Sequence, residues 1–424
     1  MSVSIKEVYP KVVRGDRQSR INVIAECTEG EILEIKIQPM EIYKIPHTER
    51  YRIDEEDRYP YVSAQKSDTG AYFIDYDFEG EQQYTFKIKV GEKIVFNTYL
   101  YSLAEDLSAL RAYKGDTHLH TNRSDGEGTP FEVACNYRRA GFDFIAITDH
   151  HKYAPSLEAK AQIGALTDMF CVLRGEEVHN KDMGYFHVVN FDGEHSINDI
   201  IETDDAYVER EIEKILANLK DEPLSDPRGI AYRIFIANEI RRANGIAIMA
   251  HPFWDVYGEY HMQTEDVRYL WKNGCYDALE VIAACDRTGH GSNLQGALWA
   301  DMRAEGLKIP VVGASDAHKA RKNAEGLFDV NFSIIFAADF DEIKSAIKDE
   351  RSVAVERFPS SDFRAVGRFR YVKYARFLLS EYFPRRDTLT ERHADALASC
   401  DARTEKIILA EGAIEAFDKR FFNL

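Results

Sequence analysis

The sequence predicts a mixed α/β protein, with a small β domain before its main domain and a helical extension after it. Three observations lead to this fold class. Short strands with period-2 alternation fill residues 1–108, strands and helices alternate over residues 109–356, and residues 357–424 have a helical pattern. The alternating region contains seven candidate β units, which is typical of a parallel barrel or a doubly wound sheet.

Length and composition limit the classes of protein that fit. The chain has 424 residues, so we expect two or three domains. A net charge of −18 argues against general binding to nucleic-acid phosphates, although bound cations can reverse the local field for a small anionic substrate. We find no apolar run of membrane-spanning length and no signal-peptide pattern. The six cysteines are scattered without a C-x-x-C pair, which favours reduced thiols and a cytoplasmic location.

Residues 1–108 are predicted to form a small sandwich of immunoglobulin-like type. Phe86, Ile88 and Val90 alternate with other residues, and Gly91 then marks the tight turn of a hairpin. This region has one histidine, His47, and no cluster of candidate ligands. We therefore expect it to serve in packing, oligomerisation or shielding of the neighbouring domain.

Helices and strands alternate from residue 109 onward. Thr129-Pro-Phe-Glu132 is a capping box with proline at the first helical position, and Gly141 is expected to end that helix. Residues 142–150 form a nearly continuous apolar run, typical of a parallel strand buried on both faces. Residues 191–244 are predicted to be a helical insertion and residues 339–348 the last barrel helix. The other predicted strands cover residues 115–120, 170–177, 185–190, 245–251, 278–282 and 309–315.

The first of these strands carries His118 and His120 with one residue between them. Side chains at positions i and i+2 of a strand point to the same face, so two imidazoles can aim at one point. Asp125 follows in the next loop. Neutral imidazole is a common ligand of divalent metals. The pattern alone is not specific, because two histidines at a strand end can also be surface residues.

Similar residues end most of the other predicted strands. Active sites of parallel barrels are built at the carboxyl ends of the strands, so these residues are candidates for one metal cluster. Asp316 and His318 repeat the i, i+2 spacing, which lets two strands hold the cluster from opposite sides. The strand-end residues are Asp149, His150 and His151, then Glu176 and Glu177, then His187, then His251, and finally Asp316 and His318.

Five motifs occur in order along residues 112–320. They are H-x-H at 118–120, T-D-H at 148–150, G-x-E at 175–177, H-P at 251–252 and D-x-H at 316–318. Together they resemble the PHP superfamily, named for polymerase and histidinol phosphatase. Lys114-Gly-Asp-Thr-His-Leu-His, Gly175-Glu-Glu-Val and Gly313-Ala-Ser-Asp-Ala-His resemble the branch that contains carbaryl hydrolase, as does a β domain before the first motif. The resemblance implies a distorted seven-stranded (β/α) barrel.

The resemblance also implies a site for two or three divalent metal ions. Glu176 is a weaker rival to Glu177, and His187 rests on its strand position alone. Asp149 and His151 are the candidate catalytic residues. They could also orient the metal ligands from outside, or only form structural hydrogen bonds. Mixed histidine and carboxylate ligands suit zinc, manganese and iron. In the implied assignment, the first metal takes His118, His120, Glu177 and Asp316, the second shares Glu177 and adds His187 and His251, and the third takes Asp125, His150 and His318.

The predicted activity is hydrolysis of a small phosphomonoester or phosphodiester. Bound metals lower the pKa of water, supply hydroxide and neutralise phosphoryl charge. Arg123, Lys152, Arg287 and Lys319 are candidate contacts to the substrate anion, although most exposed cations are simply surface. Two alternatives stay open: a carboxyl-ester or carbamate hydrolase with the same metal site, and a non-catalytic, metal-stabilised binding module. The oligomeric state is open as well, a homo-oligomer included.

Overall fold

The structure, a computed structural model, divides the chain into two compact units. The first unit holds Met1–Leu110, Lys373–Arg386 and Gly412–Leu424, and the second holds Arg111–Val372 and Asp387–Glu411. The residues of the predicted C-terminal extension thus divide between the two units. The described residues are 3–27, 31–41, 59–68, 70–179, 186–219, 224, 226–256, 258–283, 290–320, 328, 330–358, 362–400 and 402–423.

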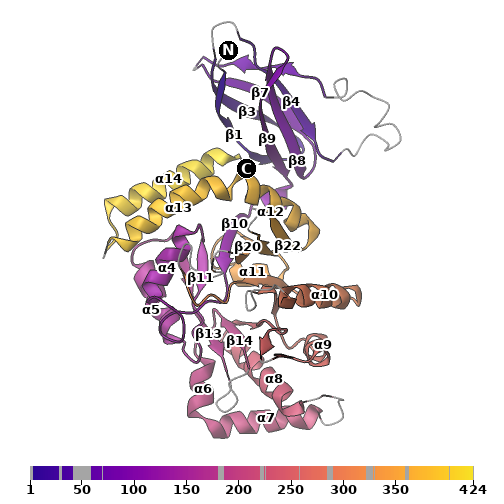
Figure 1. Ribbon diagram of the computed structural model, residues 1–424, viewed down its shortest axis with the longest axis vertical. Helices are drawn as coiled ribbons and strands as arrows, with labels where there is room; N and C mark the ends of the chain where they lie inside the picture. Colours follow the sequence, from indigo (N-terminus) through magenta and orange to yellow (C-terminus); the bar gives the residue numbers. More distant parts are fainter. Residues whose placement is uncertain are drawn as a thin grey trace. The chain divides into compact units, whose positions relative to one another are not determined.

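Two sheets share one core in the first unit (Figure 1). One sheet has the order β1-β3-β7-β6 and the other the order β23-β2-β9-β8-β4-β5. Ile21 and Val23 of one sheet and Phe86 and Leu100 of the other are fully buried in that core. The strands are β1 (Ser4–Tyr9), β2 (Val12–Arg14), β3 (Arg17–Glu26), β4 (Glu34–Pro39), β5 (Val62–Ser63), β6 (Gln65–Lys66), β7 (Tyr72–Phe78), β8 (Gln82–Val90), β9 (Lys93–Leu103) and β23 (Phe422–Asn423).

The predicted hairpin at Gly91 is confirmed. Strands β8 and β9 are antiparallel, with Val90 paired to Lys93, and Gly91 has a φ of 57°. Every second residue of β8 is buried, as the alternation predicted. Whether the two sheets are of immunoglobulin-like type stays a prediction, and His47 lies outside the described residues.

The strands of the second unit are divided between two sheets. Their orders are β12-β11-β10-β20-β21-β22 and β13-β14-β15-β18-β19, so one closed seven-stranded barrel is not confirmed. Two isolated bridges, Leu119 to Ala317 and His150 to Glu177, join the sheets. The strands are β10 (Arg111–Asp116), β11 (Phe144–Ala146), β12 (Cys171–Leu173), β13 (Gly175–Val178), β14 (Val188–Phe191), β15 (Ile246–Met249), β18 (Ala278–Ala283), β19 (Val311–Ala314), β20 (Asn331–Ala337), β21 (Ser352–Arg357) and β22 (Phe363–Gly367), with the separate hairpin β16 (Asp255–Val256) and β17 (Glu259–Tyr260).

The prediction that the strands are all parallel is wrong at β14. Strands β10, β11 and β12 are parallel to one another, as are β15, β18 and β19. Strand β14 instead runs antiparallel to both β13 and β15. Only residues 179–187 lie between β13 and β14, which is too short for the crossover that parallel neighbours need.

Strands β20, β21 and β22 were not predicted, and β22 shows that the prediction of a helical pattern over residues 357–424 is wrong at its start. β20 is buried along its whole length and pairs antiparallel with β10 and β21. It therefore lies beside β10, on the side opposite β11. The helix predicted over residues 339–348 is α11, which covers only its second half, Ile343–Lys348.

The helices follow the predicted signals closely. Thr129 and Glu132 exchange both capping-box hydrogen bonds, and Gly141, with a φ of 88°, follows the end of α4. The predicted insertion forms α6, α7 and α8, and the buried face of α7 packs on α8.

Among the described residues, no helix combines the length and apolarity needed to cross a membrane. The helices are α3 (Glu105–Ser108), α4 (Pro130–Arg139), α5 (Ala154–Gly164), α6 (Ile197–Thr203), α7 (Asp205–Leu219), α8 (Pro227–Arg242), α9 (Thr264–Lys272), α10 (His290–Ala304), α11, α12 (Phe369–Glu381), α13 (Phe383–Ala398) and α14 (Glu405–Phe421).

Candidate metal centre

Two strand extensions bring the first and last motifs together. The backbone N–H of His120 donates to the carbonyl of Ala317, and that of Asp316 donates to the carbonyl of His118, both at 2.9 Å. This parallel pairing continues β10 beside β19. Across this pairing His118 and His120 lie against Asp316 and His318, with His120 Nε2 3.0 Å from Asp316 Oδ1 and the rings of His120 and His318 4.4 Å apart.

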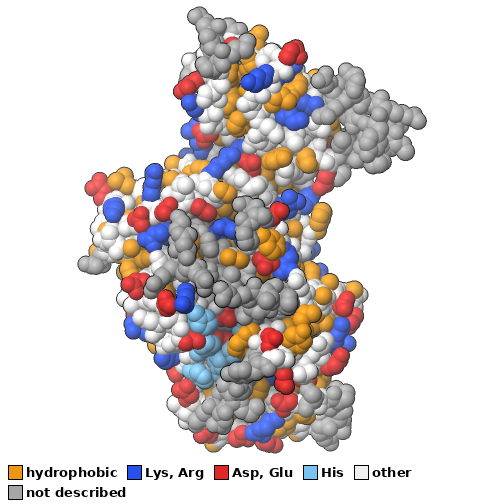
Figure 2. Space-filling view, viewed as in Figure 1, with side chains coloured by type: hydrophobic (Ala, Val, Ile, Leu, Met, Phe, Trp, Pro, Cys, Tyr) orange, Lys and Arg blue, Asp and Glu red, His pale blue; other side chains and the backbone are white. Residues whose placement is uncertain are grey.

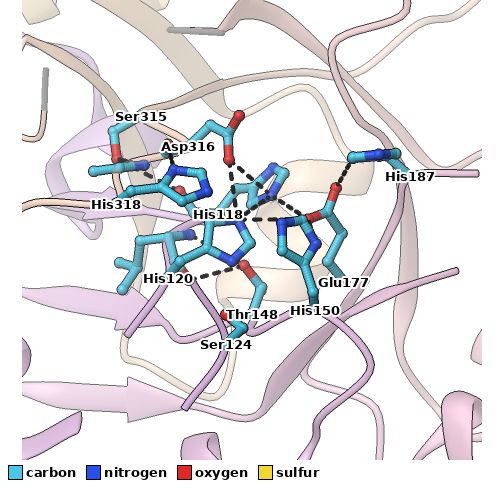
Figure 3. A network of polar contacts seen from close by, with 12 residues as sticks. His118, His120, Ser124, Thr148, His150, Glu177, His187, Ser315, Asp316 and His318 are labelled. Atoms are coloured by element: carbon cyan, nitrogen blue, oxygen red, sulfur yellow. Dashed lines mark hydrogen bonds and ion pairs between the residues drawn. The ribbon is translucent and has the colours of Figure 1, made fainter. Parts of the chain in front are cut away.

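Four of the predicted ligands converge on one point (Figure 3). The Nε2 atoms of His118 and His120 lie 3.3 and 3.4 Å from Glu177 Oε2. The same two atoms lie 3.4 and 3.0 Å from Asp316 Oδ1. His118 and His120 are almost fully buried, as is Glu177. The structure thus brings together the four residues assigned to the first metal.

The three residues assigned to the third metal also meet. Asp125 Oδ2 lies 3.2 Å from His318 Nε2 and 3.6 Å from His150 Nε2. The ring centroid of His120 lies 4.3 and 4.4 Å from those of His150 and His318, which are 6.1 Å from each other. Nitrogen or oxygen atoms of His120, Asp125, His150 and His318 all lie within 4.8 Å of one another. His120 therefore borders two candidate metal positions.

The residues assigned to the second metal are spread more widely. Glu177 Oε1 lies 2.5 Å from His187 Nδ1 and 3.6 Å from His251 Nε2. The tightest sets place His251 with His118 and Asp316, and place His187 with His150, Glu177 and His179. His187 and His251 both face the shared carboxylate, but only His187 is in close contact with it.

The side chains fit metal ions better than they fit one another. Both oxygens of Glu177, Nδ1 of His187 and both ring nitrogens of His251 are buried without a well-aligned hydrogen bond among the described residues. Burying such groups unsatisfied costs free energy, on the order of 1–3 kcal/mol each. These oxygens and ring nitrogens lie close together, but several of them point to one shared position and do not form separate hydrogen-bonded pairs. Nitrogen and carboxylate donors arranged in this way suit divalent cations.

Backbone strain accompanies two of the ligands. His251 has a φ of 21° and Asp316 a φ of 48°, a region that residues with a side chain rarely adopt. Such a conformation costs on the order of 1–3 kcal/mol and persists only where the surroundings enforce it. The backbone N–H of His251 donates to Glu280 Oε2 at 3.0 Å, and that of Asp316 donates to the His118 carbonyl. These hydrogen bonds hold the turns that present both ligands.

Glu280 also fixes the tautomer of His118, and sequence reasoning missed it. The Nδ1 atom of His118 lies 2.8 Å from Glu280 Oε1, and both residues are fully buried. A carboxylate accepts from Nδ1–H, which leaves the Nε2 lone pair of His118 toward Glu177 and Asp316. The available signal was an acidic residue inside the apolar strand Ala278–Ala283.

The structure distinguishes Glu177 from Glu176. Glu176 is buried and accepts hydrogen bonds from Asn190, Ser196 and Asn198 and from the backbone of Ile197. These partners lie at the start of α6 and on β14. Glu176 therefore anchors the insertion, whereas Glu177 faces the cluster.

Asp149 holds the loop that carries Asp125. Its carboxylate is fully buried and accepts from the backbone and hydroxyl groups of Thr121 and Ser124, at 2.5–3.2 Å. His151 is different, because its side chain is 41% exposed and its ring stacks on His179 at 4.6 Å. Of the two residues predicted as catalytic or outer partners, only His151 is open to solvent.

The three described substrate-contact candidates are engaged with other groups of the chain. Arg123 forms a two-pronged ion pair with Glu158, at 2.8 and 3.2 Å. Lys152 donates to the backbone carbonyl of Arg123. Lys319 lies 3.1 Å from Glu127. Arg287 lies outside the described residues.

Charges in the cluster strongly perturb its titration in the metal-free chain. Burial opposes ionisation of Asp316, but the imidazoles of His118, His120 and His251 hold its pKa well below the usual value. Burial likewise disfavours a charged His318, yet Asp125 outweighs it and raises the pKa of His318 to about 9. Burial dominates at His187 and lowers its pKa to about 4.

Additional histidines border the cluster. His179 is 4% exposed, and its Nε2 lies 2.7 Å from His150 Nδ1. The rings of Trp254 and His261 lie 5.3 and 5.0 Å from that of His187. Figure 2 shows histidine side chains reaching the surface together at one place. Sequence reasoning named none of these three residues, although Glu177-Val178-His179 repeats the i, i+2 spacing.

Three solved structures are similar to this chain. A two-domain protein from Bacteroides vulgatus, described as containing a PHP-like metal-dependent phosphoesterase, has 17% identity and a TM-score of 0.40, over 58% of this chain and 65% of that one. A Bifidobacterium adolescentis protein, described as a candidate metal-dependent phosphoesterase, has 20% identity and a TM-score of 0.37, over 55% and 95%. A Chromobacterium violaceum amidohydrolase has 20% identity and a TM-score of 0.32, over 48% and 87%.

These similarities are too distant to indicate what the chain acts on. None of the three bears on the branch that contains carbaryl hydrolase. No protein-family model and no curated protein matches the sequence.

Proposed function

We propose that this chain is a metal-dependent hydrolase of the PHP superfamily that cleaves a small phosphomonoester or phosphodiester. The observation that carries the proposal is the position of Glu177. Its carboxylate is completely buried, lacks a well-aligned hydrogen bond among the described residues, and lies within 3.4 Å of nitrogens of His118, His120, His150 and His187. A buried charge in this setting requires compensation, and cations held between these groups supply it.

Nine side chains would hold the cations, which we propose to be two or three zinc, manganese or iron ions. When bound, such ions lower the pKa of water toward neutrality and neutralise charge on a phosphoryl group. Imidazole and carboxylate together suit these metals better than calcium or magnesium, which prefer oxygen ligands. The ligands are His118, His120, Asp125, His150, Glu177, His187, His251, Asp316 and His318.

Charge balance favours an anionic substrate. The ligand set contains only three carboxylates, those of Asp125, Glu177 and Asp316. Three divalent cations exceed the charge of these carboxylates, of the buried Glu280 beside His118 and of one bound hydroxide, so a site with three cations is positive although the whole chain has a net charge of −18. A phosphate ester is attracted to such a site more strongly than a neutral ester is.

The chain's own groups have distinct tasks in this proposal. Glu280 keeps the proton of His118 on Nδ1. Asp149 sets the loop from which Asp125 reaches His318. His151, exposed beside His150 and with a pKa lowered by burial and by His179 and His150, is the group we propose to exchange a proton with the substrate.

A carboxyl-ester or carbamate hydrolase is the second candidate, and one observation favours it. Arg123 and Lys319 are paired with Glu158 and Glu127, and Lys152 donates to a backbone carbonyl. Cations engaged in this way are less available to a phosphate. The same metal site can act on a carbonyl carbon, so the choice depends on the groups around the substrate.

Turnover of two matched chromogenic substrates separates the candidates. The metal-loaded chain should hydrolyse p-nitrophenyl phosphate or bis-p-nitrophenyl phosphate with a kcat/KM at least tenfold above that for p-nitrophenyl acetate. The reverse order would favour the ester hydrolase. Metal content without turnover of either class would favour the non-catalytic binding module. Asp316→Asn serves as the control for contaminating hydrolases.

A further inference from the structure

We propose that His179 is a metal ligand, in addition to the nine residues named above, and that it binds the cation shared by Glu177 and His187. This inference rests on the proposed metal centre but not on the substrate assigned to it. The local sequence makes the role geometrically natural. Glu177 and His179 are two residues apart at the end of β13 (Gly175–Val178), so both side chains point to one face of the strand.

The spacing repeats that of the two other ligand pairs. His118 and His120 follow β10, and Asp316 and His318 follow β19, each with one residue between them. In both pairs the structure places the two side chains in the cluster. The end of β13 presents a third pair of the same kind.

Distances place the His179 imidazole inside the cluster. Its Nε2 atom lies 2.7 Å from His150 Nδ1 and 3.8 Å from Glu177 Oε2. Its ring centroid lies 4.4 Å from that of His187. Ligand atoms of His150, Glu177, His179 and His187 all lie within 4.8 Å of one another, whereas His251 belongs to a different set with His118 and Asp316. His179 therefore belongs to the same set as Glu177 and His187, whereas His251 lies outside that set although its Nε2 is 3.6 Å from Glu177 Oε1.

Local contacts hold the imidazole in this place. The backbone N–H of His179 donates to Asn198 Oδ1 at 3.2 Å, and the Asn198 amide donates to the Glu177 carbonyl at 3.1 Å. Asn198 is buried near the start of α6 (Ile197–Thr203). The ring of His151 stacks on the His179 ring, with planes 28° apart. Asn198 thus holds the backbone at His179, and the His151 ring restricts the imidazole, so the side chain loses less rotamer freedom on binding a metal.

The chemistry of this set also requires a cation. His150 Nδ1 lies 2.7 Å from both Glu177 Oε2 and His179 Nε2, so one hydrogen cannot satisfy all three atoms. The oxygens of Glu177 and Nδ1 of His187 have no well-aligned hydrogen bond among the described residues. His150 also faces Asp125 through its other nitrogen. If His150 binds the cation beside Asp125, the cation shared by Glu177 and His187 needs another nitrogen ligand. In this proposal His179 supplies it.

The test is a titration of the metal-free chain with Co²⁺, followed by absorption spectroscopy and by elemental analysis after dialysis. His179→Gln, which keeps the side-chain volume, should bind one tight equivalent fewer than the wild-type chain, or bind it at least tenfold more weakly. Its cobalt spectrum should change in the visible bands. His151→Gln is the matched control, because His151 stacks on His179 yet belongs to none of the ligand sets. It should keep the wild-type count.

A wild-type count and spectrum in His179→Gln would overturn the proposal, since a residue that only orients His150 would leave both unchanged. If His179→Gln is unfolded by circular dichroism, His179→Asn is titrated instead, and the same two outcomes decide. A wild-type chain that binds cations but cleaves no phosphoester contradicts the proposed function alone. A wild-type chain that binds no cobalt contradicts the metal centre and this inference together.

Discussion

His118 donates a hydrogen bond through Nδ1 to Glu280 Oε1 across 2.8 Å, and neither side chain is exposed to solvent. Glu280 is also the acceptor for the backbone N–H of His251, at 3.0 Å. One carboxylate therefore contacts proposed ligands from two of the five motifs. Outer partners of this kind fix the tautomer and position of a metal-ligating imidazole.

Replacing Glu280 should weaken metal binding without unfolding the chain. In Glu280→Gln the side-chain volume remains but the charge that holds the His118 proton is lost. We expect about a 10- to 100-fold loss of affinity for one cation, measured by competition with a chelator. Glu305→Gln, an exposed glutamate paired with Arg268, is the control. Unchanged affinity in Glu280→Gln would contradict the orienting role.

Asp149→Ala should affect one cation selectively. Asp149 anchors Thr121 and Ser124, and the loop they belong to carries Asp125. Releasing the loop should lower the affinity of the Asp125–His318 position about tenfold and leave the Glu177 positions occupied. Elemental analysis at a limiting and at a saturating metal concentration checks this. Loss of every cation with the fold intact would mean that Asp149 supports the whole cluster.

Metal binding should release protons near neutral pH. His318 has a pKa of about 9 in the metal-free chain, and carboxylates hold that of His118 well above its ordinary value, although burial opposes both. Both imidazoles are therefore protonated at pH 7, and a cation has to displace those protons. Calorimetric titrations in buffers of different ionisation enthalpy should show net release of about one proton or more per chain.

The sign of the pH dependence follows from the same shifts. Affinity should rise as the pH increases from 6 toward 9 and should level off once His318 is neutral, because less proton displacement is then needed. In the metal-free chain, the contribution of the His318–Asp125 pair to stability is complete below the unfolded histidine pKa near 6.5 and is lost as the pH rises through about 9. Proton uptake on metal binding would contradict the assigned charges.

Lys319 provides a test of substrate class. It lies beside the Asp316–His318 motif and is paired with Glu127. If the substrate is anionic, Lys319→Ala should raise KM for p-nitrophenyl phosphate several-fold and leave p-nitrophenyl acetate nearly unchanged. Glu127→Gln should have the opposite effect on KM, since it releases the ammonium group from its partner. Equal losses on both substrates would make Lys319 a structural residue.

The convergence of the proposed ligands was predictable in part, because the spacing of two motifs carries local geometry, while the full set came from the resemblance of the five motifs. The i, i+2 pairs at His118 and at Asp316 placed side chains on one face before any pairing was known. The capping box at Thr129 and the turn at Gly91 were predictable for the same local reason. Features that depend on short-range geometry were recovered.

Features set by pairing between distant segments were missed. An apolar run does not encode strand direction, so β14 was taken as parallel to its neighbours. The buried strand β20 follows the last motif in sequence and carries no candidate ligand, so it was not predicted. Glu280 belongs to none of the five sequence motifs. Its role is visible only in the structure, where its Oε1 lies 2.8 Å from His118 Nδ1. Arg287 lies outside the described residues, so its predicted contact stays a prediction.

The most direct test of the metal centre is elemental analysis of the wild-type chain beside Glu177→Gln. Glu177 lies between the two positions that include His118 and His187, so its carboxylate should be shared by two cations. We predict two or three metal equivalents in the wild-type chain and a loss of at least one in Glu177→Gln, with phosphoesterase turnover reduced a hundredfold or more. Fewer than one equivalent in the wild-type chain after reconstitution, or an unchanged count in Glu177→Gln, would contradict the account.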